Sequence, residues 1–442
     1  MNGTNAIARA CAWPGWRHAA WGFVCIGFSV TAFHVLRGCV NVPYWDDFDA
    51  HLQFLVRIED AGSFLERVRI ATEFHNEHRT LTSRATVWLA HTLGAPMNFR
   101  VLGWAGAAMF VPAVLLAGAR TGDRNARAAA TFFAAAMLFN LQHWENLFWG
   151  GSSADHVTVV PLAMLALLLL HVRARWAVAG AAGCGVLASF ALAHGLLVFP
   201  VGALVLALER RWRALACWCA ATAALACGWL FGFPASADHA YQHPEYGELS
   251  MVLHFWLGLL GAPLAFGSRA FAPWIGAAIA AAVVWLWRAG VFKQHRYHGA
   301  LLGFCALALG AIAVGRAEMD STGFMVSRYR ILSCLIVAVL CGLIFAHAAA
   351  WPRFGSAARV VLVLAIAGHW LEQTLDHWWR SADFRERQMS AVFHYEKTGT
   401  LEGSPTELYY DVPKADAILK RCEKRGIFRL VTKSEPAEDT GQ

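Results

Sequence analysis

The sequence predicts an all-α protein that crosses a lipid bilayer many times, and three observations support this. Hydrophobic residues make up 57% of the 442 residues, charged residues only 15%, and the mean hydropathy is +0.43. The apolar residues occur in continuous runs, close to the roughly 20 residues that a helix needs to span a bilayer. Only helices and closed barrels satisfy the backbone inside a bilayer, and unbroken apolar runs indicate helices.

Eleven segments have the composition expected of membrane spans. They lie at residues 19–37, 97–118, 127–143, 155–171, 176–193, 195–209, 214–232, 271–288, 299–316, 329–348 and 357–374. The first run has no small-residue cleavage signal, so we interpret it as an anchor and not as a removable signal peptide. We expect residues 250–267, which glycine and proline interrupt, to enter the membrane without crossing it. Residues 81–94 are expected to lie along its outer surface.

Basic residues in the short connectors predict the orientation of the spans, because lysine and arginine accumulate in cytoplasmic loops. Here they occupy alternate connectors, including 119–127, 172–175, 209–213 and 288–296. We therefore expect a transmembrane domain at residues 1–375, with the amino terminus in the cytoplasm. Residues 38–96 form the first outer loop, with surface helices, and residues 376–442 form a small outer segment. The richness in Ala, Arg and Trp favours a bacterial inner membrane, with the outer face in the periplasm.

Cysteine spacing and net charge argue against two classes of function. The eleven cysteines form no CxxC pair and most lie in apolar runs, so zinc or thioredoxin-like chemistry has little support. The net charge of +7 is spread over short loops between spans, where it orients the protein. We therefore expect the lipid bilayer as a partner and no nucleic acid.

The first outer loop contains the most informative motif, Tyr44-Trp45-Asp46-Asp47-Phe48-Asp49. Ionisable residues gathered at the end of a membrane span are frequently functional. The neighbouring carboxylates of Asp46 and Asp47 are expected to have pKa values pushed apart, which suits a general base. The alternative is that one of them caps a helix that begins near Phe48. We predict Asp46 and Asp47 as the catalytic residues.

Further along this loop, Glu73–Arg79 packs five ionisable groups into seven residues. His75 and His78 have a spacing compatible with a metal, but no third ligand is specified, and a solvated helix end is the alternative. We prefer a third interpretation, in which Arg79 and Arg84 bind a lipid phosphate, because guanidinium groups match phosphate bidentately. Glu77 or His78 would orient them. No metal ligands are assigned, and a divalent cation stays open as a cofactor.

Two later segments add polar residues on the outer face. The turn 142–151 combines aromatic residues with Glu145 and Asn146. A membrane-interface aromatic belt accounts for Trp149, but aromatic faces beside hydrogen-bonding groups also hold sugars, so Glu145, Asn146 and Trp149 are candidate pocket residues.

In the loop 315–330, Arg316 and Arg328 run against the tendency for positive residues to face inward. Snorkelling to the membrane surface is one explanation for such arginines. An anionic ligand is the other, and it would make both residues phosphate-binding groups, with the neighbouring Tyr329 in the substrate pocket.

These motifs resemble the GT-C superfamily of membrane glycosyltransferases and a group of bacterial multi-pass proteins related to it. The matching motifs are WDDF at 45–48, NEHR at 76–79, WENLFWG at 144–150, HGLLVFPVG at 194–202, and GR followed by SRY at 315–329. The resemblance covers most of residues 20–375. It implies a many-span bundle, an outer-loop carboxylate as catalytic base, here Asp46 or Asp47, and a donor sugar carried on a polyprenyl phosphate or diphosphate.

The resulting prediction is an inverting glycosyltransferase that moves a sugar from a polyprenyl-phosphate donor to a lipid, glycan or protein acceptor of the cell envelope. The absence of a WWDYG-like signature disfavours protein N-glycosylation. The alternatives are a transporter or flippase of lipid-linked sugars, and a non-catalytic protein of envelope assembly. A transporter is expected to show internal repeats or discontinuous helices, and the sequence shows only the interruptions at 258–267.

Overall fold

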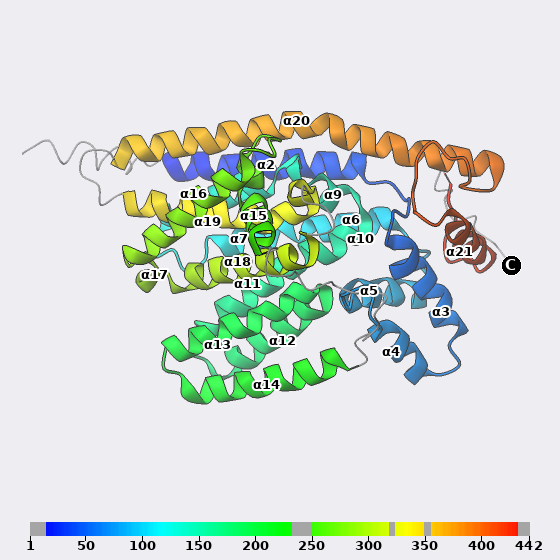
Figure 1. Ribbon diagram of the computed structural model, residues 1–442, viewed down its shortest axis with the longest axis horizontal. Coiled ribbons are helices and arrows are strands. Elements are labelled where there is room, and N and C mark those ends of the chain that lie inside the picture. Colours follow the sequence, from blue (N-terminus) through cyan, green and yellow to red (C-terminus); the bar gives the residue numbers. More distant parts are fainter. Residues whose placement is uncertain (1–14, 232–248, 318–322, 349–354, 432–442) are drawn as a thin grey trace, which may run out of the picture.

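The computed structural model describes residues 15–231, 249–317, 323–348 and 355–431, and it is almost entirely helical (Figure 1). Within these ranges there is no strand, and one isolated β-bridge joins His75 to His78. Each of the eleven predicted spans coincides with a helix or a pair of consecutive helices. The prediction of a helical membrane protein is therefore confirmed at the level of fold class.

Within the described residues, seven helical segments are long and apolar enough to cross a membrane. They are α2 (Gly15–Gly38), α6 and α7 (Phe99–Ala117), the segment Gly150–Leu170 that ends in α11 (Val159–Leu170), α14 (Trp212–Leu230), α18 (Arg296–Arg316), the segment Ser327–His347 that contains α19 (Arg330–His347), and α20 (Gly355–Thr398). The other four predicted spans correspond to shorter helices: α8 (Arg124–Leu138), α12 (Arg175–Ala191), α13 (Val198–Leu208) and α16 (Ala272–Arg288). The predicted number of eleven spans is thus not confirmed by length and composition alone.

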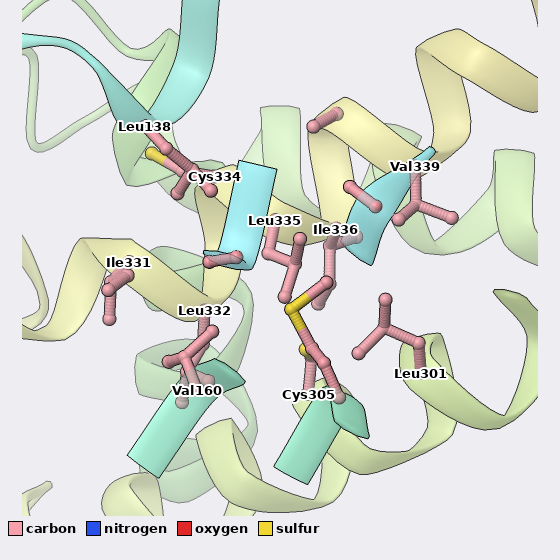
Figure 2. Packing of buried hydrophobic residues seen from close by; sticks show 14 of the residues in the cluster. Leu138, Val160, Leu301, Cys305, Ile331, Leu332, Cys334, Leu335, Ile336 and Val339 are labelled. Atoms are coloured by element: carbon pink, nitrogen blue, oxygen red, sulfur yellow. The ribbon is translucent and has the colours of Figure 1, made fainter. Parts of the chain in front are cut away.

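The centre of the bundle is built on α8 and α19. Lipid is as apolar as a leucine side chain, so close backbone packing by small residues is what holds membrane helices together. The buried surface of α8 is largely alanine, which lets α19 approach closely. Leu332, Leu335 and Ile336 of α19 point into the space between α8, α11 and α18, where Val160 and Cys305 meet them (Figure 2).

A second hydrophobic core lies outside the bundle and joins two segments that are far apart in the sequence. It combines residues 40–102 with residues 391–430 and also includes Ala154. We call the part built from residues 40–97 and 391–431 the cap. The cap includes α3 (Phe54–Asp60), α4 (Phe64–Thr72), α5 (Leu81–Thr92) and α21 (Val412–Lys424). The helix α20 runs without interruption from the bundle into the cap (Figure 1). The carboxyl-terminal segment is thus packed against the first loop.

Polar contacts fix this packing at the acidic motif. Asp49 accepts hydrogen bonds from the ammonium group of Lys414, at 2.8 Å, and from the hydroxyl of Tyr409. The backbone N–H of Trp45 donates to the carbonyl oxygen of Leu408 at 2.8 Å. The third carboxylate of the motif therefore ties the first loop to the carboxyl-terminal segment.

The basic connectors meet at the end of the bundle opposite the cap (Figure 1). Arg211, before α14, donates to the carbonyl oxygen of Leu170 at the end of α11. The hydroxyl of Tyr297, at the start of α18, donates to the carbonyl oxygen of Leu116 at 3.1 Å. The molecule thus has one end with clustered basic connectors and one end with the cap.

The segment that was expected to enter the membrane without crossing it forms α15 (Leu249–Gly261) and a following 3₁₀ turn. It packs along α16, and glycines make this close approach feasible. A Cβ atom on Gly261 would overlap the carbonyl oxygen of Ala272, and one on Gly276 would overlap that of Leu257. These two helices form a hairpin with backbone-to-backbone contact.

We predict that Gly276→Ala destabilises the protein by about 1–3 kcal/mol, because the added methyl group has no space. Gly183→Ala on α12 is the matched control, since nothing lies within 4 Å of its Cβ position. Both changes bring the same gain in helix propensity, so their difference isolates the clash. Thermal unfolding of the detergent-purified proteins measures it, and equal midpoints for the two variants would contradict the prediction.

Candidate functional site

A cavity of about 460 Å³ lies where the cap meets the bundle, within the usual range for small-molecule sites. Its lining comes from the first outer loop, from residues 149–156 and 192–194, from the end of α18, and from the turn before α19. The predicted site residues that line it are Asp46, Asp47, Glu77, His78, Trp149, Arg316, Arg328 and Tyr329. The fold thus brings the outer motifs of the sequence to one place.

The two neighbouring carboxylates of the motif have different environments. The Asp46 side chain is 55% exposed and faces the cavity, whereas that of Asp47 is 1% exposed. Oδ2 of Asp47 accepts from the backbone N–H of Tyr44 at 3.1 Å, and Oδ1 lies 3.3 Å from Nδ1 of His51. No backbone N–H of the helical turn Phe48–Gln53 donates to the Asp47 side chain, so the capping alternative does not describe Asp47.

These environments shift the two acids in opposite directions. Burial raises the pKa of the Asp47 carboxyl group, and this outweighs the nearby imidazole of His51. Partial burial also acts to raise the pKa of Asp46, but His75 and the positive charge of Arg328 outweigh it and hold that pKa below its usual value. Asp46 is therefore the ionised and accessible member of the pair. The expected separation of the two pKa values is present.

A tight turn at residues 75–78 directs the ionisable segment Glu73–Arg79 towards the cavity. His75 and His78 exchange backbone hydrogen bonds of 2.8 and 3.0 Å, and Asn76 at the tip adopts a φ of 52°, which asparagine tolerates better than most residues. Nε2 of His75 lies 3.7 Å from Oδ1 of Asp46. Oε1 of Glu77 accepts from Arg316 at 2.6 Å and lies 3.4 Å from Nε2 of His78. Glu77 and His78 therefore orient Arg316, where the sequence suggested Arg79 or Arg84.

The guanidinium groups of Arg79 and Arg84 bind main-chain carbonyl groups and do not line the cavity. Arg79 donates from Nε to Trp229 at 2.9 Å, and Arg84 donates from Nη1 to Glu73 at 2.6 Å. Burial lowers the pKa of Arg84 to about 10, so this residue stays protonated at neutral pH. Both arginines hold the first loop against neighbouring elements, and the phosphate-binding proposal below relies on Arg316 and Arg328.

Arg328 is fixed by the turn that contains Glu145 and Asn146. Oε1 of Glu145 lies 3.5 Å from its guanidinium group, and Oε2 accepts from its backbone N–H at 3.0 Å. The side-chain amide of Asn146 donates to its carbonyl oxygen at 3.0 Å. The rings of Trp149 and Tyr329 lie 5.6 and 5.2 Å from the guanidinium carbon. Trp149 and Tyr329 line the cavity, whereas Glu145 and Asn146 lie behind it and position Arg328.

Sequence reasoning missed several cavity residues, namely His51, Thr80, Asp155, His156 and His194. Asp155 and His156 lie at the start of a predicted span, and the apolar residues that follow led to their assignment to that span and not to the site. They belong to a π-helical turn, Ser153–Val157, and the turn Phe48–Gln53 is also π-helical. Such turns are rare and frequently occur at functional sites. Ionisable residues inside an apolar run were the available signal.

Glycine permits the close packing of these two π-helical turns. A Cβ atom on Gly151 would overlap Oδ1 of Asp47 and would crowd the ring of His51. Asp155 follows Gly151 by about one helical turn, so its carboxylate belongs to the same buried region of the lining. Within the described ranges, no three His, Cys, Asp or Glu side chains are grouped so that they could hold a metal ion.

Comparisons with protein-family models, with curated proteins and with solved structures found no match to this chain. The geometry of the cavity is therefore the basis for the functional argument that follows.

We predict opposite pH effects on stability for Asp46→Asn and Asp47→Asn. The raised pKa of Asp47 means that ionising its carboxyl group destabilises the folded protein once the pH exceeds about 3.9, the pKa of an aspartate in the unfolded chain. Asp47→Asn removes this charge, so the variant should become more stable than the parent as the pH rises towards neutral. A lowered pKa contributes stability above that value, which is lost as the pH falls through the folded pKa. The Asp46 variant should thus be less stable than the parent at pH 7 and match it in acid.

Thermal midpoints of the parent and both variants from pH 8 down to about pH 2, below the pKa of an aspartate in the unfolded chain, measure these effects. Changes of the same sign for the two variants would show that the carboxylates do not have the opposite environments described above.

Proposed function

We propose that this protein is an inverting glycosyltransferase of the bacterial inner membrane, of the GT-C type that its motifs resemble. It transfers a sugar from a polyprenyl-phosphate donor to an acceptor of the cell envelope. The observation that carries the proposal is that one cavity unites an accessible carboxylate, Asp46, with two arginines, Arg316 and Arg328. A base and an anion-binding group are the two functions that this reaction requires.

In the proposed reaction, Asp46 takes the proton from an acceptor hydroxyl group as its oxygen attacks the anomeric carbon of the donor. The bond from that carbon to the phosphate oxygen breaks, and its electron pair leaves with the phosphate. Arg316 and Arg328 stabilise the negative charge that develops there, which is most effective in a site shielded from bulk water. Attack opposite the leaving group inverts the anomeric configuration. The reaction as written uses no metal ion.

The environments of the acids favour Asp46 over Asp47 as the base. A general base must be ionised and within reach of the substrate. Asp46 is half exposed to the cavity and its pKa is held low, whereas Asp47 is buried with a raised pKa. Glu145 and Glu77 each have an ion-pair partner among the arginines that the proposal uses. They are therefore positioning residues.

We further propose that the chain crosses the membrane eleven times, with the cap and the cavity in the periplasm. The clustering of basic connectors at the opposite end supports this orientation, because such residues accumulate on the cytoplasmic side. The cavity would then open at the outer surface, where lipid-linked sugars and envelope acceptors meet.

We predict that Asp46→Asn lowers sugar transfer by roughly 10²–10⁴-fold, the usual contribution of a general base. The measurement is transfer of radiolabelled sugar from the polyprenyl-phosphate pool of isolated membranes, at matched amounts of folded protein. Asp383→Asn is the control, because Asp383 is exposed on α20 and pairs with Arg387 one helical turn away, at 2.8 Å.

Full transfer by the Asp46 variant would rule out its role as the base. If the parent chain bound the lipid donor and released no product from it, transport or a scaffolding role would replace the proposal.

We also predict that Arg328→Lys raises the KM for the lipid donor by roughly tenfold or more, since it removes one hydrogen bond to a charged group. Lysine keeps the charge but loses the planar fork that matches phosphate. Arg359→Lys is the matched control, because Arg359 donates to a carbonyl oxygen of α19, at 2.8 Å, far from the cavity. Equal donor KM values in both variants would remove Arg328 from phosphate binding.

A further inference from the structure

The buried part of the cavity lining contains polar atoms that make no hydrogen bond within the described residues. They are Nε2 of His51, Nε2 of His75, Oγ1 of Thr80, Nε1 of Trp149, Oδ1 of Asp155, Nδ1 of His156 and Nε2 of His194. Oδ1 of Asp47 lies 3.3 Å from Nδ1 of His51 and has no other partner among the described residues. We call Asp47, His51, Thr80, Asp155, His156 and His194 the buried wall; His75 and Trp149 lie beside Asp46 and Arg328 on the open side. Buried polar groups in folded proteins are nearly always paired, so a concentration of unpaired ones in a cavity indicates a bound polar ligand.

The buried wall differs chemically from the open side of the cavity. The open side carries Arg316 and Arg328, with side chains 33% and 30% exposed. The buried wall contains two carboxylates, three imidazoles and a hydroxyl group, and no lysine or arginine lines it within the described ranges. Asp47, His51, Thr80 and Asp155 are each more than nine-tenths buried. This set offers many hydrogen-bond acceptors and some donors, without a fixed positive charge.

We infer that the buried wall binds the hydroxyl groups of an uncharged sugar ring. The inference deepens the proposed function and rests on it for the identification of the ligand as a sugar. A carboxylate accepts hydrogen bonds from adjacent hydroxyl groups through its two oxygens, and imidazole and hydroxyl groups can donate or accept. The unpaired atoms of Thr80, Asp155 and His194 would be satisfied by such a ring.

The two carboxylates of the buried wall exclude a sugar that carries a carboxylate of its own. A carboxylate on the ligand would be buried beside Asp47 and Asp155 without a cation on the wall to pair with it, and burying an unpaired charge is very costly. The arginines on the open side are committed to the phosphate in the proposed reaction. The cavity is thus divided between a buried wall for the uncharged ring and an open side for the phosphate and the base.

The test is saturation-transfer NMR of the detergent-purified full chain with simple glycosides. The uncharged probes are the methyl glycosides of glucose, mannose and galactose, and the acidic probe is methyl glucuronide. We expect at least one uncharged probe to receive magnetisation from the protein, and the acidic probe to receive much less. Asp155→Asn should reduce the signal by roughly tenfold, the loss for one hydrogen bond involving a charged group, and His194→Gln by about threefold, the loss for one between neutral groups.

Control variants separate this inference from the proposed function. Asp383→Asn and Arg359→Lys, both on α20 and outside the cavity lining, should both retain the signal. Absence of signal from all three uncharged probes would overturn the inference. So would signals that survive both wall substitutions, or an acidic probe that binds as well as the best uncharged one. If the parent chain bound the sugar probes but transferred no sugar, the glycosyltransferase proposal would be wrong, whereas the inference that the buried wall binds a sugar would be retained.

Discussion

The absence of water inside a bilayer is the constraint on which the rest of this structure depends. Backbone groups without partners are costly there, so the chain must cross as helices. The same cost confines most charged side chains to the two ends of the bundle or to enclosed polar sites. One end collects the basic connectors, and the other supports the cap and the cavity. The separation of charged residues to the two ends of the bundle is therefore a consequence of the apolar interior of the bilayer.

Three carboxylates within four residues of the cap have different surroundings and different contacts. Asp46 faces the cavity, Asp47 is enclosed against Tyr44 and His51, and Asp49 binds Lys414 and Tyr409 of the carboxyl-terminal segment. The backbone of Trp45 adopts a φ of 47°, a conformation that costs energy for a residue with a side chain. The hydrogen bond from Trp45 to Leu408 holds that geometry. The carboxyl-terminal segment thus contributes to the site by fixing the loop that carries the acids.

Arg316 and Arg328 depend on partners from distant parts of the chain. Glu77, in the first loop, orients Arg316, and Glu145, in the turn before the third long apolar segment, orients Arg328. Such charge-assisted contacts restrict long side chains that would otherwise sample many rotamers. Because the partners belong to the cap and to the bundle, the geometry of the cavity is sensitive to how these two parts pack together.

The sequence by itself determined the fold class, the positions of the helices and most of the open side of the cavity. Apolar runs have the length of a membrane span, and ionisable residues beside them stand out, as at Asp46 and Arg328. Hydropathy could not reveal that Arg79 and Arg84 bind carbonyl groups, because this depends on backbone brought close by folding. Tertiary structure alone decided which acid is exposed and joined His51, Asp155 and His194 into one wall, since burial and proximity across long sequence separations arise only from packing.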